Sequence, residues 1–287
     1  MKRVDRIASM RAAARAWRAE GRRIGFVPTM GALHAGHLSL VTRSRSECDV
    51  TVVSIFVNPL QFGPDEDLSR YPRDLDGDVA ELESAGADLL FTTTPDEMYP
   101  PGFETHVVPG SLAEPLCGAS RPGHFHGVTT VVAKLFHVVA PHAAYFGQKD
   151  FQQARVLQRM AADLDFDLEL KIVPTLREQD GLAMSSRNRY LSQAERRVAP
   201  ELHRALLAVQ REFDGGERAA APLAEVGRGA LAACKEFRLD YLEVRDDETL
   251  RAVDRLRSGG VAAAAAILGT TRLIDNVLLG DAVRRLG

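Results

Sequence analysis

The sequence has few cysteines, no long apolar run and no excess of positive charge, and so lacks features that are typical of metal-binding, membrane-spanning and nucleic-acid-binding proteins. It contains only three cysteines, Cys48, Cys117 and Cys234, which are far apart and lack the spacing of metal ligands. No apolar run approaches the length needed to span a membrane. The formal net charge of -3 gives no electrostatic case for broad nucleic-acid binding. We therefore expect reduced thiols, a cytoplasmic location, and neither a nucleic acid nor a membrane as partner.

The composition is that of a globular protein, with 45% hydrophobic and 26% charged residues in a chain of 287. Apolar runs typical of buried strands alternate with helical patterns in the first part of the chain. The runs lie at 24–28, 49–57, 88–91, 143–147 and 168–173, and the helical patterns lie at 5–20, 36–46, 74–86, 127–139 and 148–164. Near-continuous apolar strands separated by helices predict a parallel sheet covered by helices on both faces.

The pattern changes after residue 192. Two alanine-rich helices are predicted at about 193–213 and 222–237, and three strands follow at 239–244, 262–268 and 272–277. We therefore predict an α/β protein with two domains. A Rossmann-like domain would span residues 1–175, and a smaller α+β domain would span residues 176–287.

The most informative stretch follows the first of these strands. Pro28 should close the strand, since proline cannot donate to a sheet ladder, and a helix begins after a glycine-containing turn. His34 and His37 are three residues apart at the start of this helix, where backbone N–H groups and the helix dipole favour an anion. Gly36 between them would leave the backbone open to a bulky ligand. The stretch suggests chemistry on a nucleotide phosphate, although an isolated pair is as often a polar helix end.

Two other polar segments also follow strands, Asn58–Phe62 and Gly147–Gln153. Ligands of open parallel sheets lie beyond the carboxyl ends of the strands, so these segments and the two histidines should converge on one crevice. Lys149 could supply a point charge for phosphate there, or be a surface lysine. Met184–Asn188 holds two hydroxyls and a guanidinium, which suit a triphosphate clamp or an exposed turn.

Several other residues have two interpretations each. The amides of Asn58, Gln61 and Gln153 could bind a small polar acid or belong to turns and helix surfaces. Arg121 could pair with a carboxylate or be solvated. An acidic cluster at Asp74, Asp76 and Asp78 could hold Mg²⁺ or complement a helix dipole. His124 and His126 are interpreted as loop or helix-cap histidines.

Together these segments resemble one family, pantothenate synthetase (pantoate–β-alanine ligase), within the two-histidine nucleotidylyl transferases. The matching motifs are Pro28-Thr29-Met30-Gly31-Ala32-Leu33-His34-x-Gly-His37, Phe56-Val57-Asn58-Pro59-x-Gln61-Phe62-Gly63, Tyr71-Pro72-Arg73, Tyr145-Phe146-Gly147-Gln148-Lys149-Asp150, Asp180-Gly181-Leu182-Ala183-Met184-Ser185-Ser186-Arg187-Asn188 and Arg272-Leu273-Ile274-Asp275-Asn276. Their order and spacing are far more specific than the two-histidine pattern alone. Ala35 and Leu60 depart from the family's usual residues.

The resemblance implies an ATP-dependent ligation in two steps, through a pantoyl adenylate. Pantoate, β-alanine and ATP would be the substrates, Mg²⁺ would accompany ATP, and the protein would be a homodimer. The small domain is expected to act as a lid that shields the adenylate from water.

The resemblance also implies site residues. The catalytic set would be His34, His37, Lys149, Ser185, Ser186 and Arg187. The ATP-binding set would be Met30, Gly36, His37, Gly147, Lys149, Asp150, Leu176, Met184, Ser185 and Arg187. Pantoate and β-alanine would contact Met30, Asn58, Gln61, Arg121, Phe146 and Gln153, and Mg²⁺ would involve Asp76 and Asp78.

The sequence also fits two alternatives. One is another two-histidine transferase, of the phosphopantetheine or nicotinate mononucleotide type, but those chains are usually shorter and lack the Gly147–Asp150 block. The other is a regulatory nucleotide-binding protein without turnover, which would not need every charge-stabilising group.

Overall fold

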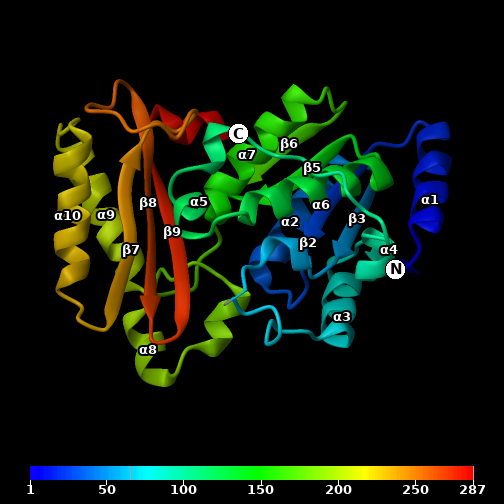
Figure 1. Cartoon of the computed structure of the whole chain (residues 1–287), viewed down its shortest axis with the longest axis horizontal. Helices are drawn as coiled ribbons and strands as arrows, with labels where there is room; N and C mark the ends of the chain where they lie inside the picture. The colour runs from blue at the N-terminus through cyan, green and yellow to red at the C-terminus, as the bar shows by residue number, and fades with distance from the viewer. Residues whose placement is uncertain (65, 287) are drawn as a thin grey trace. The chain divides into compact units, whose positions relative to one another are not determined.

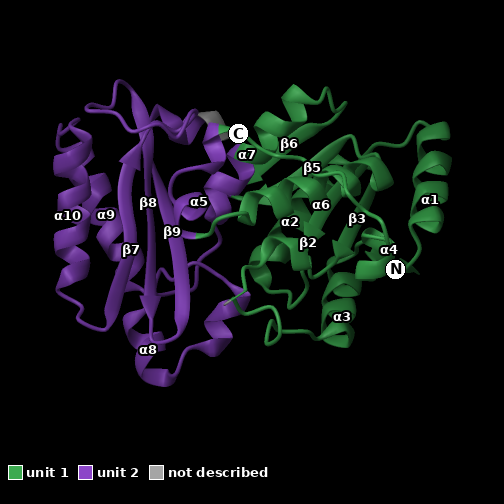
Figure 2. Cartoon of the chain, in the orientation of Figure 1, with its two compact units in different colours: residues 1–110, 121–147, 156–173 green, residues 111–120, 148–155, 174–287 purple. Residues whose placement is uncertain are grey.

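A computed structural model describes residues 1–64 and 66–286, and it divides into two compact units. The first unit comprises residues 1–110, 121–147 and 156–173, and the second comprises residues 111–120, 148–155 and 174–287 (Figure 2). Each unit contains its own sheet (Figure 1). The units are assembled from separated segments, whereas the domains expected from the sequence are continuous.

The first unit is built on a parallel sheet of six strands in the order β1-β4-β3-β2-β5-β6. The strands are β1 (Lys2–Val4), β2 (Ile24–Thr29), β3 (Val50–Ile55), β4 (Leu89–Thr92), β5 (Ala143–Gly147) and β6 (Glu169–Val173). This confirms the predicted sheet. The short strand β1 was not predicted, because its three residues lie at the sheet edge and carry no apolar pattern.

Helices cover the parallel sheet. They are α1 (Ile7–Ala19), α2 (Ala35–Glu47), α3 (Leu75–Ala85), the short α4 (Pro95–Met98), α6 (His124–Val139) and α7 (Phe151–Asp163), whose first turn lies in the second unit. Val27 and Val53 of the sheet pack with Leu40 of α2 and Leu82 of α3 in one buried cluster. Successive strand residues point to opposite faces, so Phe26 faces the other side, where α1 and α6 contact β2.

Pro28 does not end its strand as predicted. It lies within β2, opposite Ser54 of β3, and Thr29 continues the pairing with Ile55. The Thr29 carbonyl accepts from the Phe56 N–H, so the backbone polar groups of Thr29 point toward β3. Those of the preceding residue, Pro28, point toward the opposite edge of β2, where β5 lies. On that side β2 pairs with β5 only at Gly25 and Phe26, so the missing N–H of Pro28 interrupts no ladder.

The second unit is built on an antiparallel sheet in the order β7-β8-β9. Its strands are β7 (Phe237–Arg245), β8 (Gly259–Leu268) and β9 (Thr271–Gly280), and its helices are α5 (Cys117–Ser120), α8 (Gln193–Val198), α9 (Glu201–Asp214) and α10 (Ala220–Ala232). The single helix predicted at 193–213 is two helices. Pro200 separates them, because a helix interior does not accommodate proline.

Strand β8 is buried on both faces. Ala262, Ala264 and Ala266 pack with residues of α9 and α10 in one cluster. On the other face Ala263 packs with Leu116 and Phe151, which explains why the short segments around these two residues belong to this unit. Alternate residues of β8 therefore pack into two different apolar clusters, one on each face of the sheet. The small alanine side chains allow both clusters to pack close to the strand.

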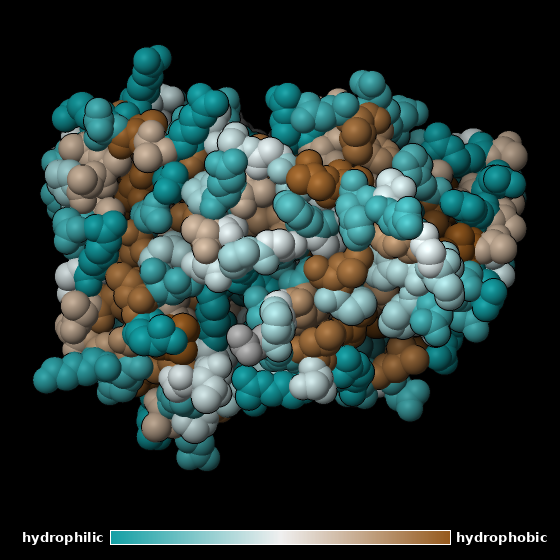
Figure 3. All heavy atoms as spheres, in the orientation of Figure 1, coloured by the Kyte–Doolittle hydropathy of each residue, from teal (hydrophilic) through white to brown (hydrophobic). Residues whose placement is uncertain are grey.

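The surface is mixed, as expected for a chain with an ordinary share of hydrophobic and charged residues. On the face shown in Figure 3, hydrophilic residues are interspersed with smaller hydrophobic patches. Within the described part of the chain, no helix combines the length and apolar character required to cross a membrane.

Candidate active site

The strand order of the first unit reverses between β2 and β5. From β2 the chain adds β3 and β4 on one side, and it then returns to place β5 on the other side. Open parallel sheets bind ligands at the carboxyl ends of the strands at such a switch point. The segment Met30–His37 follows β2, and Gly147 ends β5, so two of the predicted segments begin at this place.

His34 and His37 lie together at the start of α2, with ring centroids 4.0 Å apart. His34 is the N-cap residue and has extended backbone angles, while His37 lies in the first turn. The His34 Nδ1 atom accepts a hydrogen bond from the Gly36 backbone N–H at 3.1 Å. A nitrogen that accepts is unprotonated, so neutral His34 carries its proton on Nε2. The cap thus places the Nε2–H group of neutral His34 at the positive end of a helix dipole.

The turn before His34 is held in a constrained conformation. Gly31 and Ala32 both have positive φ angles, +80° and +50°, which is unusual for alanine. The buried Asp78 carboxylate accepts hydrogen bonds from the backbone N–H groups of Ala32 at 2.8 Å and Leu33 at 2.6 Å. A Cβ atom at position 31 would lie 2.9 Å from Asp78 Oδ2, so glycine is required there. Asp78 therefore anchors the turn that leads into the two histidines.

This anchoring bears on the predicted Mg²⁺ ligands. Both oxygens of Asp78 already accept backbone N–H groups, whereas Asp76 is exposed in the first turn of α3. Among the described residues, no group of three or more His, Cys, Asp or Glu side chains is arranged to hold a metal ion. The described residues around Asp76 and Asp78 therefore do not form a complete set of protein ligands for a metal ion.

A chain of amide hydrogen bonds follows β3. The Asn58 Nδ2 group donates to Gln61 Oε1 at 3.0 Å and to the Gly127 carbonyl at 3.1 Å. Its Oδ1 atom accepts from the Leu60 N–H and from the Tyr99 hydroxyl. Asn58 is buried and makes four hydrogen bonds within the chain, one of which orients the Gln61 amide.

Gln61 in turn approaches Met30. The Gln61 Nε2 group donates to Met30 Sδ at 3.2 Å, so two residues predicted to bind the acid substrates are brought together. The short 3₁₀ turn Pro59–Gln61 packs against Gly127 of α6, where a Cβ atom would lie 2.2 Å from the Leu60 carbonyl oxygen. The close approach of two backbones therefore fixes the position of Gln61.

Arg121 is paired with an acidic side chain of the chain itself. Its Nε and Nη2 groups donate to the two Glu66 oxygens at 2.7 and 2.6 Å. The His124 ring bridges this pair to Gln61, with Nδ1 2.8 Å from the Gln61 carbonyl oxygen and Nε2 3.1 Å from Arg121 Nη1. Since a carbonyl accepts and a guanidinium donates, neutral His124 carries its proton on Nδ1.

Burial alone would raise the pKa of Glu66, but the hydrogen bonds and positive charge of Arg121 lower it below its ordinary value. The structure thus shows a carboxylate already bound to the guanidinium that was predicted to bind a substrate carboxylate.

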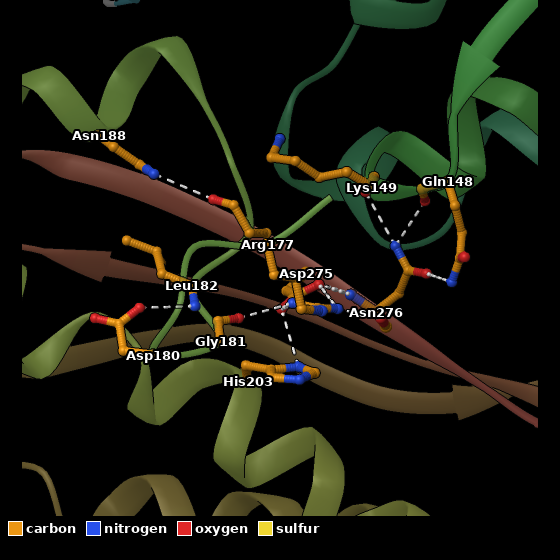
Figure 4. A network of polar contacts seen from close by, with 11 residues as sticks. Gln148, Lys149, Arg177, Asp180, Gly181, Leu182, Asn188, His203, Asp275 and Asn276 are labelled. Atoms are coloured by element: carbon orange, nitrogen blue, oxygen red, sulfur yellow. Dashed lines mark hydrogen bonds and ion pairs between the residues drawn. The ribbon is translucent and has the colours of Figure 1, made fainter. Parts of the chain in front are cut away.

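In the second unit, Lys149 lies in the turn that precedes α7, and its ammonium nitrogen is 3.7 Å from Asp150 Oδ1. The Asn276 amide of β9 donates to the backbone carbonyls of Gln148 at 2.9 Å and Lys149 at 3.0 Å (Figure 4). Gln148 Nε2 donates back to Asn276 Oδ1 at 3.1 Å. The backbone that carries Lys149 is therefore tied to the antiparallel sheet.

The segment 176–188 is more ordered than the polar loop expected from the sequence. Arg177 and Ala183 form an antiparallel bridge, and the Met184 N–H donates to the Leu176 carbonyl at 3.0 Å. A 3₁₀ helix, Ser186–Tyr190, follows, and Ser185 caps it by accepting from the Arg187 N–H at 3.3 Å. The four residues Met184–Arg187 thus leave a short hairpin and enter a helical turn.

Asp275 of β9 holds this hairpin. Arg177 donates to both Asp275 oxygens, at 2.6 and 3.0 Å, and His203 Nδ1 lies 3.4 Å from Asp275 Oδ2 (Figure 4). Burial would raise the pKa of Asp275, but His203 and Arg177 together lower it below its ordinary value. The charge pair therefore persists inside the unit.

The remaining predicted residues are placed as follows. Phe146 is buried in β5 against Phe136, Gly147 ends that strand, Gly36 lies in the first turn of α2, Asp150 and Gln153 flank the start of α7, and Leu176 is exposed. Lys149, Asp150, Gln153, Leu176 and Met184–Arg187 belong to the second unit, while the other predicted residues belong to the first.

Comparison with known proteins identifies relatives over nearly the whole chain. A family model described as "Pantoate-beta-alanine ligase" matches residues 2–278. "Pantothenate synthetase 1" of Bradyrhizobium diazoefficiens is 56% identical over 280 residues, which cover 97% of this chain and 98% of that protein. "Pantothenate synthetase" of Thermotoga neapolitana is 51% identical over 280 residues, covering 98% of this chain and 100% of that protein.

Solved structures agree with this relationship. The pantothenate synthetase of Thermus thermophilus superposes with a TM-score of 0.91 at 50% identity, covering 96% of this chain and 99% of that one. The pantoate-beta-alanine ligase of Francisella tularensis, described as complexed with beta-gamma ATP and beta-alanine, gives a TM-score of 0.80 at 34% identity, with 97% of each chain covered.

Proposed function

Because this chain belongs to the pantoate-beta-alanine ligase family, we propose that it joins pantoate to β-alanine at the expense of ATP, forming pantothenate, AMP and pyrophosphate. The matches extend over nearly the full length of both this chain and its relatives. The activity of the family therefore applies to the whole chain and not to one of its parts.

The reaction has two steps. A carboxylate oxygen of pantoate attacks the α-phosphorus of ATP, the bond to the bridging oxygen of pyrophosphate breaks, and pantoyl adenylate forms. The uncharged amine of β-alanine then attacks the activated carbonyl carbon and loses a proton to solvent, the bond to the phosphate oxygen breaks, and AMP leaves as the amide forms. The first step builds negative charge on phosphoryl oxygens, which preorganised donors stabilise.

The observation that carries this proposal is the imidazole pair at the start of α2. His34 presents an Nε2–H donor because its Nδ1 atom is used as the helix cap, and His37 lies beside it. We assign both residues to the ATP phosphates, as electrostatic stabilisers and not as nucleophiles. Met30 and Gly36 nearby are assigned to the ATP-binding set.

Residues of the second unit complete the proposed catalytic set. Lys149 supplies a point charge, and Ser185, Ser186 and Arg187 supply two hydroxyls and a guanidinium for phosphate oxygens. The assignment is supported by the ordered backbone of the segments that carry these side chains. The Asn276 contacts hold the Lys149 backbone, and the hairpin at 176–184 holds the other segment. Further ATP contacts are assigned to Gly147, Asp150, Leu176 and Met184.

The acid substrates are assigned to the other predicted residues. Gln61 and Gln153 would bind the polar groups of pantoate, and Met30 and Phe146 would provide an apolar wall. Asn58 acts through Gln61, whose amide it orients. Arg121 has two possible functions here. It exchanges its Glu66 partner for the carboxylate of a substrate, or it keeps the Glu66 pair and fixes the loop that carries Glu66.

Three further features belong to the proposal. Asp76 is the candidate protein ligand for the Mg²⁺ that would accompany ATP and would supply positive charge to its phosphates, while Asp78 is kept as a backbone anchor. The protein works as a homodimer. It acts in the cytoplasm, where ATP for a biosynthetic ligation is supplied.

The test measures AMP, pyrophosphate and pantothenate with ATP and Mg²⁺, comparing pantoate alone, β-alanine alone and both acids. We expect steady release of all three products in equal amounts only with both acids. His37→Ala should lower the rate about 100- to 1000-fold, the usual effect of removing one preorganised donor. If neither acid supports turnover while ATP still binds, the substrate assignment is wrong.

A further inference from the structure

Two adjacent residues of β9 reach two different segments that carry the proposed phosphate-binding groups. Successive strand residues point to opposite faces of the sheet. Asp275 accordingly meets Arg177 and His203 of α9, while Asn276 meets the turn of Gln148 and Lys149. Both β9 residues are buried, with exposed fractions of 4% and 2%.

We propose that Asn276 is a positioning residue for adenylate formation, because it fixes the backbone from which Lys149 extends. Asp275 fixes the neighbouring hairpin in the same way, through Arg177. This inference rests on the proposed function, since it assumes that Lys149 acts on the phosphates of ATP. Neither β9 residue is assigned a contact with substrate.

The side-chain amide of Asn276 is fully used by these contacts. Its two N–H hydrogens go to the carbonyls of Gln148 and Lys149, and its oxygen accepts from Gln148 Nε2. Only an amide of this length offers two donors and one acceptor here. An aspartate of the same shape would turn an acceptor toward two carbonyl oxygens, while keeping the bond from Gln148.

These contacts determine where Lys149 can reach. A lysine side chain is flexible, so the position of its backbone sets the region that its ammonium group can occupy. Two consecutive carbonyls of that backbone are bound to one rigid strand, and the Lys149 side chain is only 19% exposed. Catalytic groups must be held to within about 0.5 Å, and a shift of about 1 Å costs on the order of 100-fold in rate.

The hairpin is tied to the same strand by a stronger contact. Arg177 makes a two-pronged ion pair with Asp275, and its Nη1 also donates to the Gly181 carbonyl at 3.1 Å. Arg177 and Ala183 pair across the hairpin, one residue before Met184. One strand therefore sets the positions of both Lys149 and the Met184–Arg187 segment within the second unit, and their separation depends on β9.

The test is a double-mutant cycle between Asn276→Asp and Lys149→Met, read by pantoate-dependent exchange of labelled pyrophosphate into ATP. Asn276→Asp should lower kcat for exchange about 100-fold. Lys149→Met should lower it about 100- to 1000-fold. If Asn276 acts through Lys149, the double variant should lie within about threefold of Lys149→Met alone, because effects within one unit are non-additive.

A purely structural role would give a different result. Damage to the fold acts independently of the lysine, so the losses would multiply and the double variant would fall about 100-fold below Lys149→Met. That outcome overturns the inference, as does an Asn276→Asp variant with the kcat of the wild type. Exchange rates are taken per folded molecule, well below the thermal midpoint of each variant.

Two further variants make the cycle robust. Gln148→Met removes one of the three amide contacts and should lower kcat about fivefold, the weight of one neutral hydrogen bond, so it replaces Asn276→Asp in the cycle if that variant fails to fold. Gln210→Glu makes the same amide-to-carboxylate change at a partly exposed position of α9 and should keep wild-type exchange.

The wild-type protein tests the proposed function separately. If it shows no pantoate-dependent exchange, the proposed function is overturned, and the inference with it.

Discussion

The Asp78 carboxylate lies 2.6 Å from the backbone nitrogen of Leu33, which is 45 residues away in the chain. The same carboxylate binds the Ala32 N–H, and it fills the space that a side chain at Gly31 would need. One buried acid thus holds a turn with two positive φ angles immediately before the imidazole pair. The cost of that backbone conformation is offset by charge-assisted hydrogen bonds.

We expect Asp78→Asn to lower the free energy of unfolding by about 2 kcal/mol, because one of the two backbone N–H groups would then face an amide donor. The released turn should also lower kcat/KM about 100-fold through misplacement of His34 and His37. Urea unfolding and pyrophosphate exchange measure the two effects. Glu81→Gln, an exposed change on the same helix, should stay within about 0.5 kcal/mol of the wild type. Wild-type turnover of Asp78→Asn would contradict the anchoring role.

His34 has two roles that different substitutions should separate. Asparagine is a good N-cap residue and alanine is a poor one, so His34→Ala should lose about 1 kcal/mol of stability while His34→Asn should lose little. Both variants lack the imidazole, and both should lose about 100-fold in the rate of adenylate formation. Thermal unfolding and pyrophosphate exchange on the same samples make the comparison. An active His34→Asn variant would reduce His34 to a helix cap.

The Glu66–Arg121 pair should make stability depend on pH. The pKa of Glu66 is lowered in the folded protein, so the pair stabilises the fold above about pH 4.5 and loses its effect as the pH falls through the lowered folded pKa. Glu66→Gln should therefore cost about 1 kcal/mol at pH 7 and almost nothing near pH 3. Urea unfolding of both proteins across this range measures the difference. A difference that does not change with pH would show that the charge of Glu66 is unimportant.

Gly127 should be intolerant of any side chain. A Cβ atom there would meet the Leu60 carbonyl oxygen at 2.2 Å, and backbone cannot move aside as a side chain can. Gly127→Ala should cost about 2 kcal/mol and raise the KM for pantoate, because the 3₁₀ turn that carries Gln61 would shift. Gly229 of α10 has open space around it, so Gly229→Ala should instead stabilise the protein by about 0.5–1 kcal/mol. Equal effects of the two changes would contradict this explanation.

The sequence was most informative where a local pattern decides the structure. Buried parallel strands are apolar along their whole length, so residues such as Val50–Ile55 reveal both the strand and the kind of sheet. The histidine pair was placed correctly at the start of α2, since strand, turn and helix follow one another directly there. The extent of β2 was misjudged at Pro28, because the absence of a partner strand on one side cannot be read from β2 alone.

Long-range polar contacts escaped prediction. Asp78 was considered only as a dipole-complementing acid or a metal ligand, and its bonds to Ala32 and Leu33 depend on how α3 packs. Asp275 and Asn276 entered only as part of a motif, with no role attached. The bond from Arg177 to Asp275 joins positions 98 residues apart, and the bond from Asn276 to Lys149 joins positions 127 residues apart. No periodicity in the sequence records such pairs. The available signal was an acid and an amide side by side among the apolar residues that follow Arg272 in β9.

The two-faced burial of β8 has a consequence for synthesis of the chain. Leu116 and Phe151, which cover one face of Ala263, leave the ribosome long before β8 and β9 do. At about 5–20 residues per second, the C-terminal strands follow Phe151 by roughly 6–25 s. During that interval these apolar side chains have no sheet to pack on, although the first sheet can already form. Nascent chains released early should therefore be recognised by chaperones through these two short segments.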